Sequence, residues 1–151
     1  MNVKQDTLEH IALVADLIWK ITDELLDRAD AHDETKLESP EKEMFEIWRP
    51  QLNEMDVNSP EYEDALKQMG PALRHHYAKN SHHPEHNSNG IAGMTLVDVC
   101  EMVCDWIAAA RRSGKSVSPE WARDRFGIEP QLLSIIENTL KEFDKTKEPG
   151  D

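Results

Sequence analysis

Apolar residues recur at spacings of three and four along most of this chain, and that period is typical of helices. Between Thr7 and about Ala29 one such stripe consists of Ile11, Val14, Ile18, Ile21 and Leu25. This spacing places the side chains on one face of an α-helix. No alternating run of Val, Ile and Thr predicts a strand. The sequence therefore predicts an all-α fold.

Three serine-proline pairs predict where helices begin: Ser39-Pro40, Ser59-Pro60 and Ser118-Pro119. In each pair the serine can cap the helix, and the proline fits the first helical position. The first helix is expected to run to about Leu52 and the third to about Gly127. The second meets Gly70-Pro71, where we expect a kink or a short break.

Thr95 predicts the start of another helix, because it can form a variant of the capping box with Asp98. A last helix begins at Pro130 and carries a regular apolar face. Together the segments predict a compact bundle of about six helices. We expect a single domain over residues 1–143 and a frayed tail over residues 144–151.

The charge of the chain argues against two classes of partner. Its 151 residues hold 30 Asp and Glu against 17 Lys and Arg, a formal charge of −13. Nucleic-acid polymers and anionic membranes bind basic surfaces, so neither is expected as a partner. No stretch approaches the ~20 apolar residues of a membrane span, and the first residues lack the apolar part of a signal peptide. Cys100 and Cys104 are expected to be small buried residues in a reducing cytoplasm.

Five of the seven histidines lie close together, in and before a loop expected over residues 80–93: His75, His76, His82, His83 and His86. Imidazole and carboxylate groups bind Zn, Mn, Fe, Co and Ni, so we expect a metal site. Neighbours on a helix point about 100° apart, so His75 and His76 cannot both face one ion. Residues seven apart on an unbroken helix lie about 10 Å apart. His76 can therefore meet His82 or His83 only if the helix stops and the chain turns back.

A second candidate for metal chemistry is the pair His32-Asp33, which is followed by Lys36. A histidine and a carboxylate at a helix end can bind one metal, and the second oxygen of Asp33 can bridge to another. The alternative is a local hydrogen-bonded pair. No H-E-x-x-H segment is present, which argues against a zinc protease.

These residues, in this order, resemble the HD-domain superfamily of metal-dependent phosphohydrolases. HDETKLESPEKEMF, HHPEHNSNG and LVDVCEM are similar to segments of its HD-GYP phosphodiesterase branch. The Gly-Tyr-Pro of that branch is missing, and Glu101 stands where it has a second aspartate. The chain is also similar, over nearly its whole length, to a family of small, uncharacterised HD-like proteins of bacteria and phages. Those proteins carry similar HDxSKL, HHYxxNxHHPEH, EMxxDWxAA and RFGI segments.

The resemblance implies one or two divalent transition-metal ions, of Mn, Fe, Co, Ni or Zn rather than Mg. The metal ligands that it implies are His10, His32, Asp33, His76 (or His75), His82 or His83, and Asp98. Asp33 and Lys36 are implied as catalytic residues, with Lys36 on the phosphate or the leaving oxygen. We expect Glu101 to accept the other N–H of a ligand histidine.

Residues near the histidines are weaker candidates for substrate contacts. Arg74 and Lys79 could bind phosphate, with solvated surface as the alternative for each. Tyr77 could line a pocket or stack on a base. The four tryptophans are expected to pack in or beside the core: Trp19, Trp48, Trp106 and Trp121.

The expected function is that of a cytoplasmic metal-dependent phosphohydrolase acting on a small nucleotide or a related phosphoester. Two alternatives stay open, an HD-type di-iron oxygenase and a non-catalytic acidic module that binds a ligand or a protein. The expected partner is a small phosphorylated substrate. A homodimer is a further alternative, because exposed helical faces are expected.

Overall fold

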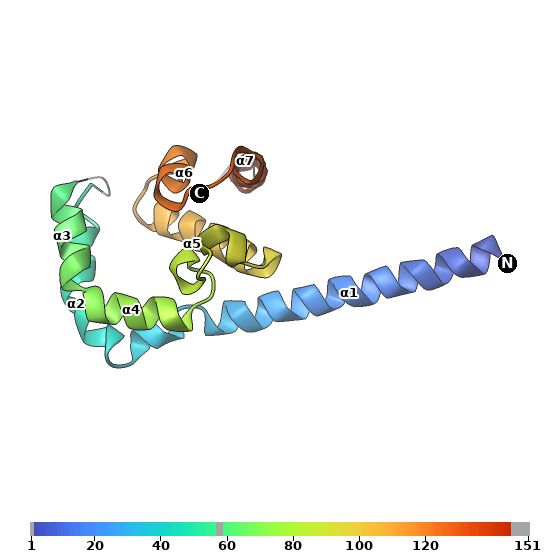
Figure 1. The fold of residues 1–151 in the computed structure, drawn as a ribbon, viewed down its shortest axis with the longest axis horizontal. Helices are drawn as coiled ribbons and strands as arrows, with labels where there is room; N and C mark the ends of the chain where they lie inside the picture. The colour runs from blue at the N-terminus through green and yellow to red at the C-terminus, as the bar shows by residue number, and fades with distance from the viewer. Residues whose placement is uncertain (1, 57–58, 146–151) are drawn as a thin grey trace. The chain divides into compact units, whose positions relative to one another are not determined.

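The computed structural model describes residues 2–56 and 59–145. Seven α-helices and no strand occur in these residues, which confirms the all-α prediction. The α-helices are α1 (Val3–Ala31), α2 (Glu41–Leu52), α3 (Pro60–Gln68), α4 (Gly70–Lys79), α5 (Leu96–Arg112), α6 (Pro119–Phe126) and α7 (Pro130–Lys145) (Figure 1). Short 3₁₀ helices are η1 (Glu34–Leu37), η2 (Pro84–His86) and η3 (Gly90–Gly93). Over the described residues no helix has the length and apolar character needed to cross a membrane.

Contacts divide the chain into two units, Met1–His32 and Asp33–Asp151. The first unit contains α1, which Asn2 caps by accepting a hydrogen bond from the N–H of Lys4 at 3.2 Å. The single domain predicted over residues 1–143 stays a prediction. The predicted tail begins within α7, and residues 146–151 lie outside the described part of the chain.

Three helices of the second unit, α3, α5 and α6, begin at their predicted caps, and α6 also ends at the predicted glycine. The hydroxyls of Ser59 and Ser118 each accept the backbone N–H three residues on, at 3.1 and 3.2 Å. Thr95 and Asp98 form a capping box at the start of α5. Gly127 ends α6 in the left-handed conformation with φ 63°, which glycine adopts without steric cost.

Two boundaries correct or sharpen the predictions. Met69 separates α3 from α4, and Pro71 stands in the first turn of α4, so the interruption yields seven helices instead of six. The prediction that Ser39 caps a helix is wrong, since α2 begins at Glu41 with Pro40 before it. The first N–H groups of α2 donate instead to the carbonyl of Glu38, at 3.1 and 2.9 Å.

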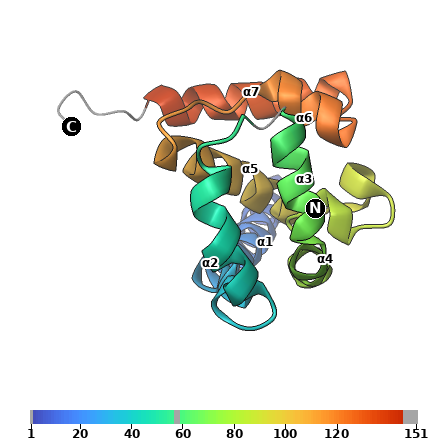
Figure 2. The same cartoon turned by 90° about the vertical axis from the view of Figure 1, so that its left-hand side faces the viewer.

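The hydrophobic core of the second unit lies where α5, α6 and α7 meet, on the upper side of Figure 2. Its buried members are Met102, Val103, Ile107, Ala122, Ile128 and Ile136. Trp106 and Trp121 are partly buried against this core, in line with their predicted packing role. Trp48 is half-buried on α2, whereas the packing prediction is wrong for Trp19, which is 67% exposed on α1. The prediction that Cys100 and Cys104 are buried is wrong, because both are exposed on α5 outside its core face.

Candidate metal site

The histidine-rich segment folds back on itself because α4 stops at Lys79. Asn80 ends this helix, and both its backbone N–H and its side-chain amide donate to the carbonyl of His76, at 3.0 and 2.8 Å. The chain then turns, and Nε2 of His83 lies 2.8 Å from Nε2 of His76. The helix therefore ends where the two histidines need it to end.

Four side chains converge at this turn: Asp33, His76, His82 and His83. One ligand atom of each lies within 4.8 Å of the others. Oδ1 of Asp33 is 3.3 Å from Nε2 of His76 and 3.7 Å from Nε2 of His82. Three imidazole nitrogens and a carboxylate oxygen suit a transition metal. The group could hold a metal ion.

Asp33 contributes to this group from a left-handed turn. Its backbone has φ 58° and ψ 14°, a conformation that Asp adopts more readily than most other non-glycine residues. The next residues form η1, and Nζ of Lys36 donates to Oδ2 of Asp33 in a close ion pair. One oxygen of Asp33 thus faces the histidines while the other faces a cation.

Two carboxylates orient the buried histidine rings. Nδ1 of His76 donates to Oε2 of Glu41 at 2.9 Å, and Nδ1 of His82 donates to Oε1 of Glu101 at 2.9 Å. An ionised carboxylate only accepts, so each ring carries a proton on Nδ1 and keeps a lone pair on Nε2. Metal-binding histidines commonly have such a partner, which fixes their tautomer and orientation.

The surroundings also keep two of these histidines, His83 and His76, neutral. Burial lowers the pKa of His83 to about 3, together with the neighbouring rings of His82 and His76. Burial lowers the pKa of His76 as well, and the nearby ammonium of Lys36 adds to this effect. Neutral imidazole is the form that binds metals, so no proton has to leave these rings at neutral pH.

Glu41 is a site residue that the sequence analysis missed. It is 0% exposed, and besides His76 it accepts a hydrogen bond from Nδ1 of His75 at 2.7 Å and from the hydroxyl of Thr35 at 2.9 Å. The sequence feature that could have indicated Glu41 is the Pro40-Glu41 pair, which follows the His-Asp-x-x-Lys segment. Nothing in the local pattern separated this glutamate from others on the same helix.

Two of the five clustered histidines lie outside the group of four. His75 is directed to Glu41, and its side chain is 38% exposed. His86 is exposed, and its Nδ1 donates to the carbonyl of Tyr77 at 2.8 Å. The choice between His75 and His76, which the sequence left open, therefore falls on His76 in this group.

Asp98 is buried but is not a member of the group of four. Its Oδ2 accepts hydrogen bonds from the backbone N–H and the hydroxyl of Thr95, at 2.8 and 2.7 Å. Its Oδ1 accepts the hydroxyl of Ser81 at 2.7 Å. A ligand role for Asp98 stays a prediction from the resemblance.

His10 and His32 belong to the first unit. His10 is exposed on α1, and His32 follows the last residue of that helix. Their predicted roles as metal ligands likewise stay predictions.

The weaker candidates for substrate contacts lie around α4. Arg74 and Lys79 are exposed there. Tyr77 is half-buried, with its ring centroid 5.0 Å from that of His83, and burial raises its pKa to about 12. The Tyr77 hydroxyl therefore keeps its proton at neutral pH, and substrate roles for all three residues stay predictions.

Comparisons with curated proteins and with solved structures find no match to this chain. One family model does match, and it covers residues 1–142, which include the four converging side chains and both orienting carboxylates. The chain belongs to that family, which is described as a family of unknown function (DUF5662).

Proposed function

We propose that this protein is a cytoplasmic, metal-dependent phosphohydrolase that acts on a small nucleotide or a related phosphoester. The observation that carries the proposal is the convergence of Asp33, His76, His82 and His83, with the Lys36 ammonium beside the carboxylate. A cation next to a candidate metal site provides a local positive centre in a chain of charge −13. An anionic phosphoester can bind at such a centre.

The four converging residues would hold the metal ion. Three imidazole ligands favour Zn, Fe, Co, Ni or Mn over Mg, which prefers oxygen ligands. The hydrogen bonds from His76 to Glu41 and from His82 to Glu101 leave Nε2 of both rings available as ligands. A second ion stays an expectation from the resemblance alone.

When bound, a divalent ion supplies two effects, a lower pKa for water and polarisation of the phosphoryl group. Hydrolysis transfers the phosphoryl group to water and releases the alcohol, so negative charge grows on the leaving oxygen. Lys36 can offset that charge, because its ammonium lies against Asp33 at the edge of the group. The Lys36 cation also helps to bind the phosphate in the ground state.

Activity and metal content of the purified full chain test this proposal. We expect phosphate release from at least one member of a nucleotide and phosphoester panel with Zn, Mn, Fe, Co or Ni. His76→Asn should lose both metal and activity, whereas His86→Asn, which changes a histidine outside the group, should keep both. Bound metal without phosphate release from any compound would overturn the proposal, and a bound iron pair with O₂ consumption would favour an oxygenase.

A further inference from the structure

A cavity of about 420 Å³ lies within the second unit, beside the candidate metal site. Asp33 and Lys36 are part of its lining, so the cavity begins at the carboxylate and the cation described above. The rest of its wall comes mainly from α2, α5, α6 and the loop between α5 and α6. Its volume falls within the ~300–1,000 Å³ of typical small-molecule sites.

The cavity wall is rich in aromatic side chains. Four of the nine aromatic residues of the chain line it: Phe45, Tyr62, Trp106 and Trp121. The rings of Trp106 and Trp121 meet edge to face with centroids 6.1 Å apart, and Phe126 stacks on Trp106 at 5.7 Å. These contacts hold the two indoles in place, and both remain partly exposed. Fixed aromatic surfaces of this kind bind planar rings by stacking.

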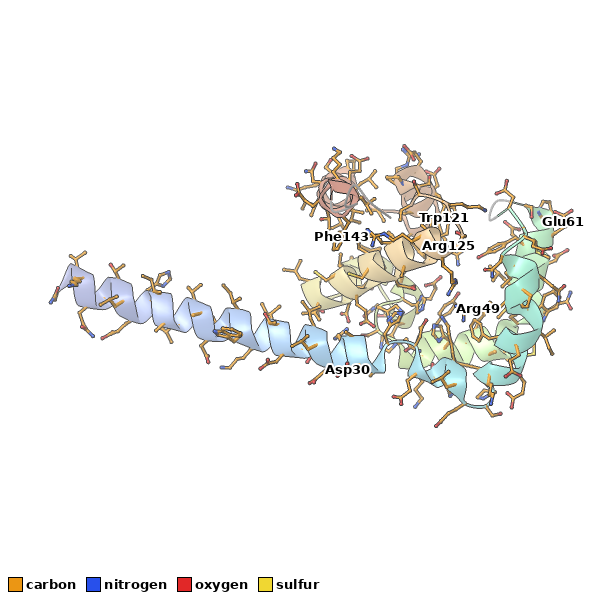
Figure 3. The ribbon with its side chains drawn as sticks, turned by 180° about the vertical axis from the view of Figure 1, so that it is seen from behind. Asp30, Arg49, Glu61, Trp121, Arg125 and Phe143 are labelled. Atoms are coloured by element: carbon orange, nitrogen blue, oxygen red, sulfur yellow. The ribbon has the colours of Figure 1, made fainter. Side chains whose placement is uncertain are left out.

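The charge of the wall is opposite to that of the chain. Four cations line the cavity, Lys36, Arg49, Arg112 and Lys115, against two acids, Asp33 and Asp105. The wall therefore carries two surplus positive charges, whereas the whole chain carries −13. Figure 3 labels Arg49 and Trp121, which bring a cation from α2 and a ring from α6 to the same wall.

Three of these four cations are available for a ligand. Lys36 pairs with Asp33, but no ion pair involves Arg49, Arg112 or Lys115 within residues 2–56 and 59–145. Unpaired cations that share a cavity with aromatic rings fit a ligand that combines a planar ring with negative charge. One phosphate at Lys36 and the metal site leaves these three cations unused.

We propose that this cavity binds the organic part of the substrate, which contains a planar ring and a second anionic group besides the phosphate at the metal site. Nucleoside bisphosphates and diphosphates have this chemistry. The ring would lie against the aromatic wall, and the second anionic group would contact Arg49, Arg112 or Lys115. This inference rests on the proposed function for the position of the first phosphate, and it narrows the substrate class.

The experiment measures binding to the full chain in EDTA, so that no probe is hydrolysed. The probes are adenosine 3′,5′-bisphosphate, AMP and ribose 5-phosphate, and the signal is tryptophan fluorescence with calorimetry as a second readout. We expect the bisphosphate to bind about tenfold more tightly than AMP, and AMP to bind more tightly than ribose 5-phosphate, which lacks the ring.

Glutamine variants identify the cations. Arg49→Gln, Arg112→Gln and Lys115→Gln should each weaken bisphosphate binding by about two- to fivefold, the range of an exposed ion pair. All three residues are exposed, so these variants should fold. Lys141→Gln on α7 is the matched control, because Lys141 is exposed and outside the cavity, and it should bind like the wild type.

Two outcomes would overturn the inference: equal affinity for probes with and without the ring, or cavity variants that bind like Lys141→Gln. Both can occur in a protein that hydrolyses phosphoesters, so they would leave the proposed function intact. Conversely, if the protein shows the expected binding pattern but no hydrolase activity, the ligand-binding role of the cavity is supported and the proposed phosphohydrolase activity is contradicted.

Discussion

Replacing Glu41 by glutamine tests whether a buried carboxylate holds the candidate metal site together. Glu41 is 0% exposed and accepts from His75, His76 and Thr35. Glutamine has almost the same shape but only one accepting oxygen, which can serve either His75 on one side or His76 and Thr35 on the other. The NH₂ group must then face a ring nitrogen that now donates.

The structure indicates how this conflict resolves. The side chain of His75 is 38% exposed, so its ring can change tautomer and accept the new N–H at little cost. The bonds to His76 and Thr35 survive as neutral bonds, which are about half as strong as charge-assisted ones. We therefore expect Glu41→Gln to lower the free energy of unfolding by about 1–2 kcal/mol.

The effect on metal binding should be larger than the effect on folding. Removing the carboxylate partner of a ligand histidine commonly weakens metal affinity by about 10–100-fold. Urea unfolding in EDTA measures the first effect, and competition with a chromogenic chelator measures the second. Glu46→Gln is the matched control, because Glu46 is exposed on the same helix and should change stability by no more than about 0.5 kcal/mol. If Glu41→Gln equals Glu46→Gln in both assays, Glu41 does not orient the site.

Four further predictions concern single residues. Asp33→Asn keeps the left-handed turn but loses the carboxylate, so helical circular dichroism should persist while metal affinity falls at least about tenfold. In EDTA, the urea concentration at the midpoint of unfolding should be steady above pH 6.5 and should fall between pH 6.5 and pH 3. The reason is that the pKa of His83 is about 3 in the folded chain and 6.5 in the unfolded chain, so the unfolded chain binds the proton first as the pH falls. His83→Asn should make the midpoint less dependent on pH in this range. Thr95→Ala removes a capping-box partner and should cost about 1 kcal/mol in urea unfolding, more than Thr139→Ala inside α7. Gly127→Ala meets no atom within 4 Å but has φ 63°, so it should lower stability by about 1 kcal/mol, and Gly127→Asn by less.

Helix ends were predictable where the bonds that form them are local. Ser59, Ser118 and Thr95 satisfy N–H groups three residues away, so the sequence contains both partners of each bond. Ser39 has the same local pattern, yet the carbonyl of Glu38 satisfies the start of α2 in its place. A backbone carbonyl is present at every position, and residue type therefore gives no sign of this competitor.

The site was predictable only as a set of residue types and spacings. The seven-residue gap between His76 and His83 required the helix to stop, and the structure contains that stop at Asn80. The exclusion of His75 depends on Glu41, which lies 34 residues away in the chain. A single long-range contact of this kind produces no periodic pattern in a sequence. Glu41 therefore looks like the other glutamates on a helix that is mostly exposed.

The aromatic wall of the cavity shows the same limit of prediction from the sequence, here for substrate binding. Helical spacing placed Trp106 and Trp121 in or beside the core, and both do pack there, on Phe126 and on each other. Packing and binding are compatible roles, since a ring fixed by the core on one side can present its other side to a cavity. Periodicity reports only the first role. The second depends on Arg49 and Lys115, which reach the same cavity from distant segments, and so the cations decide whether the tryptophans bind a ligand or only support the fold.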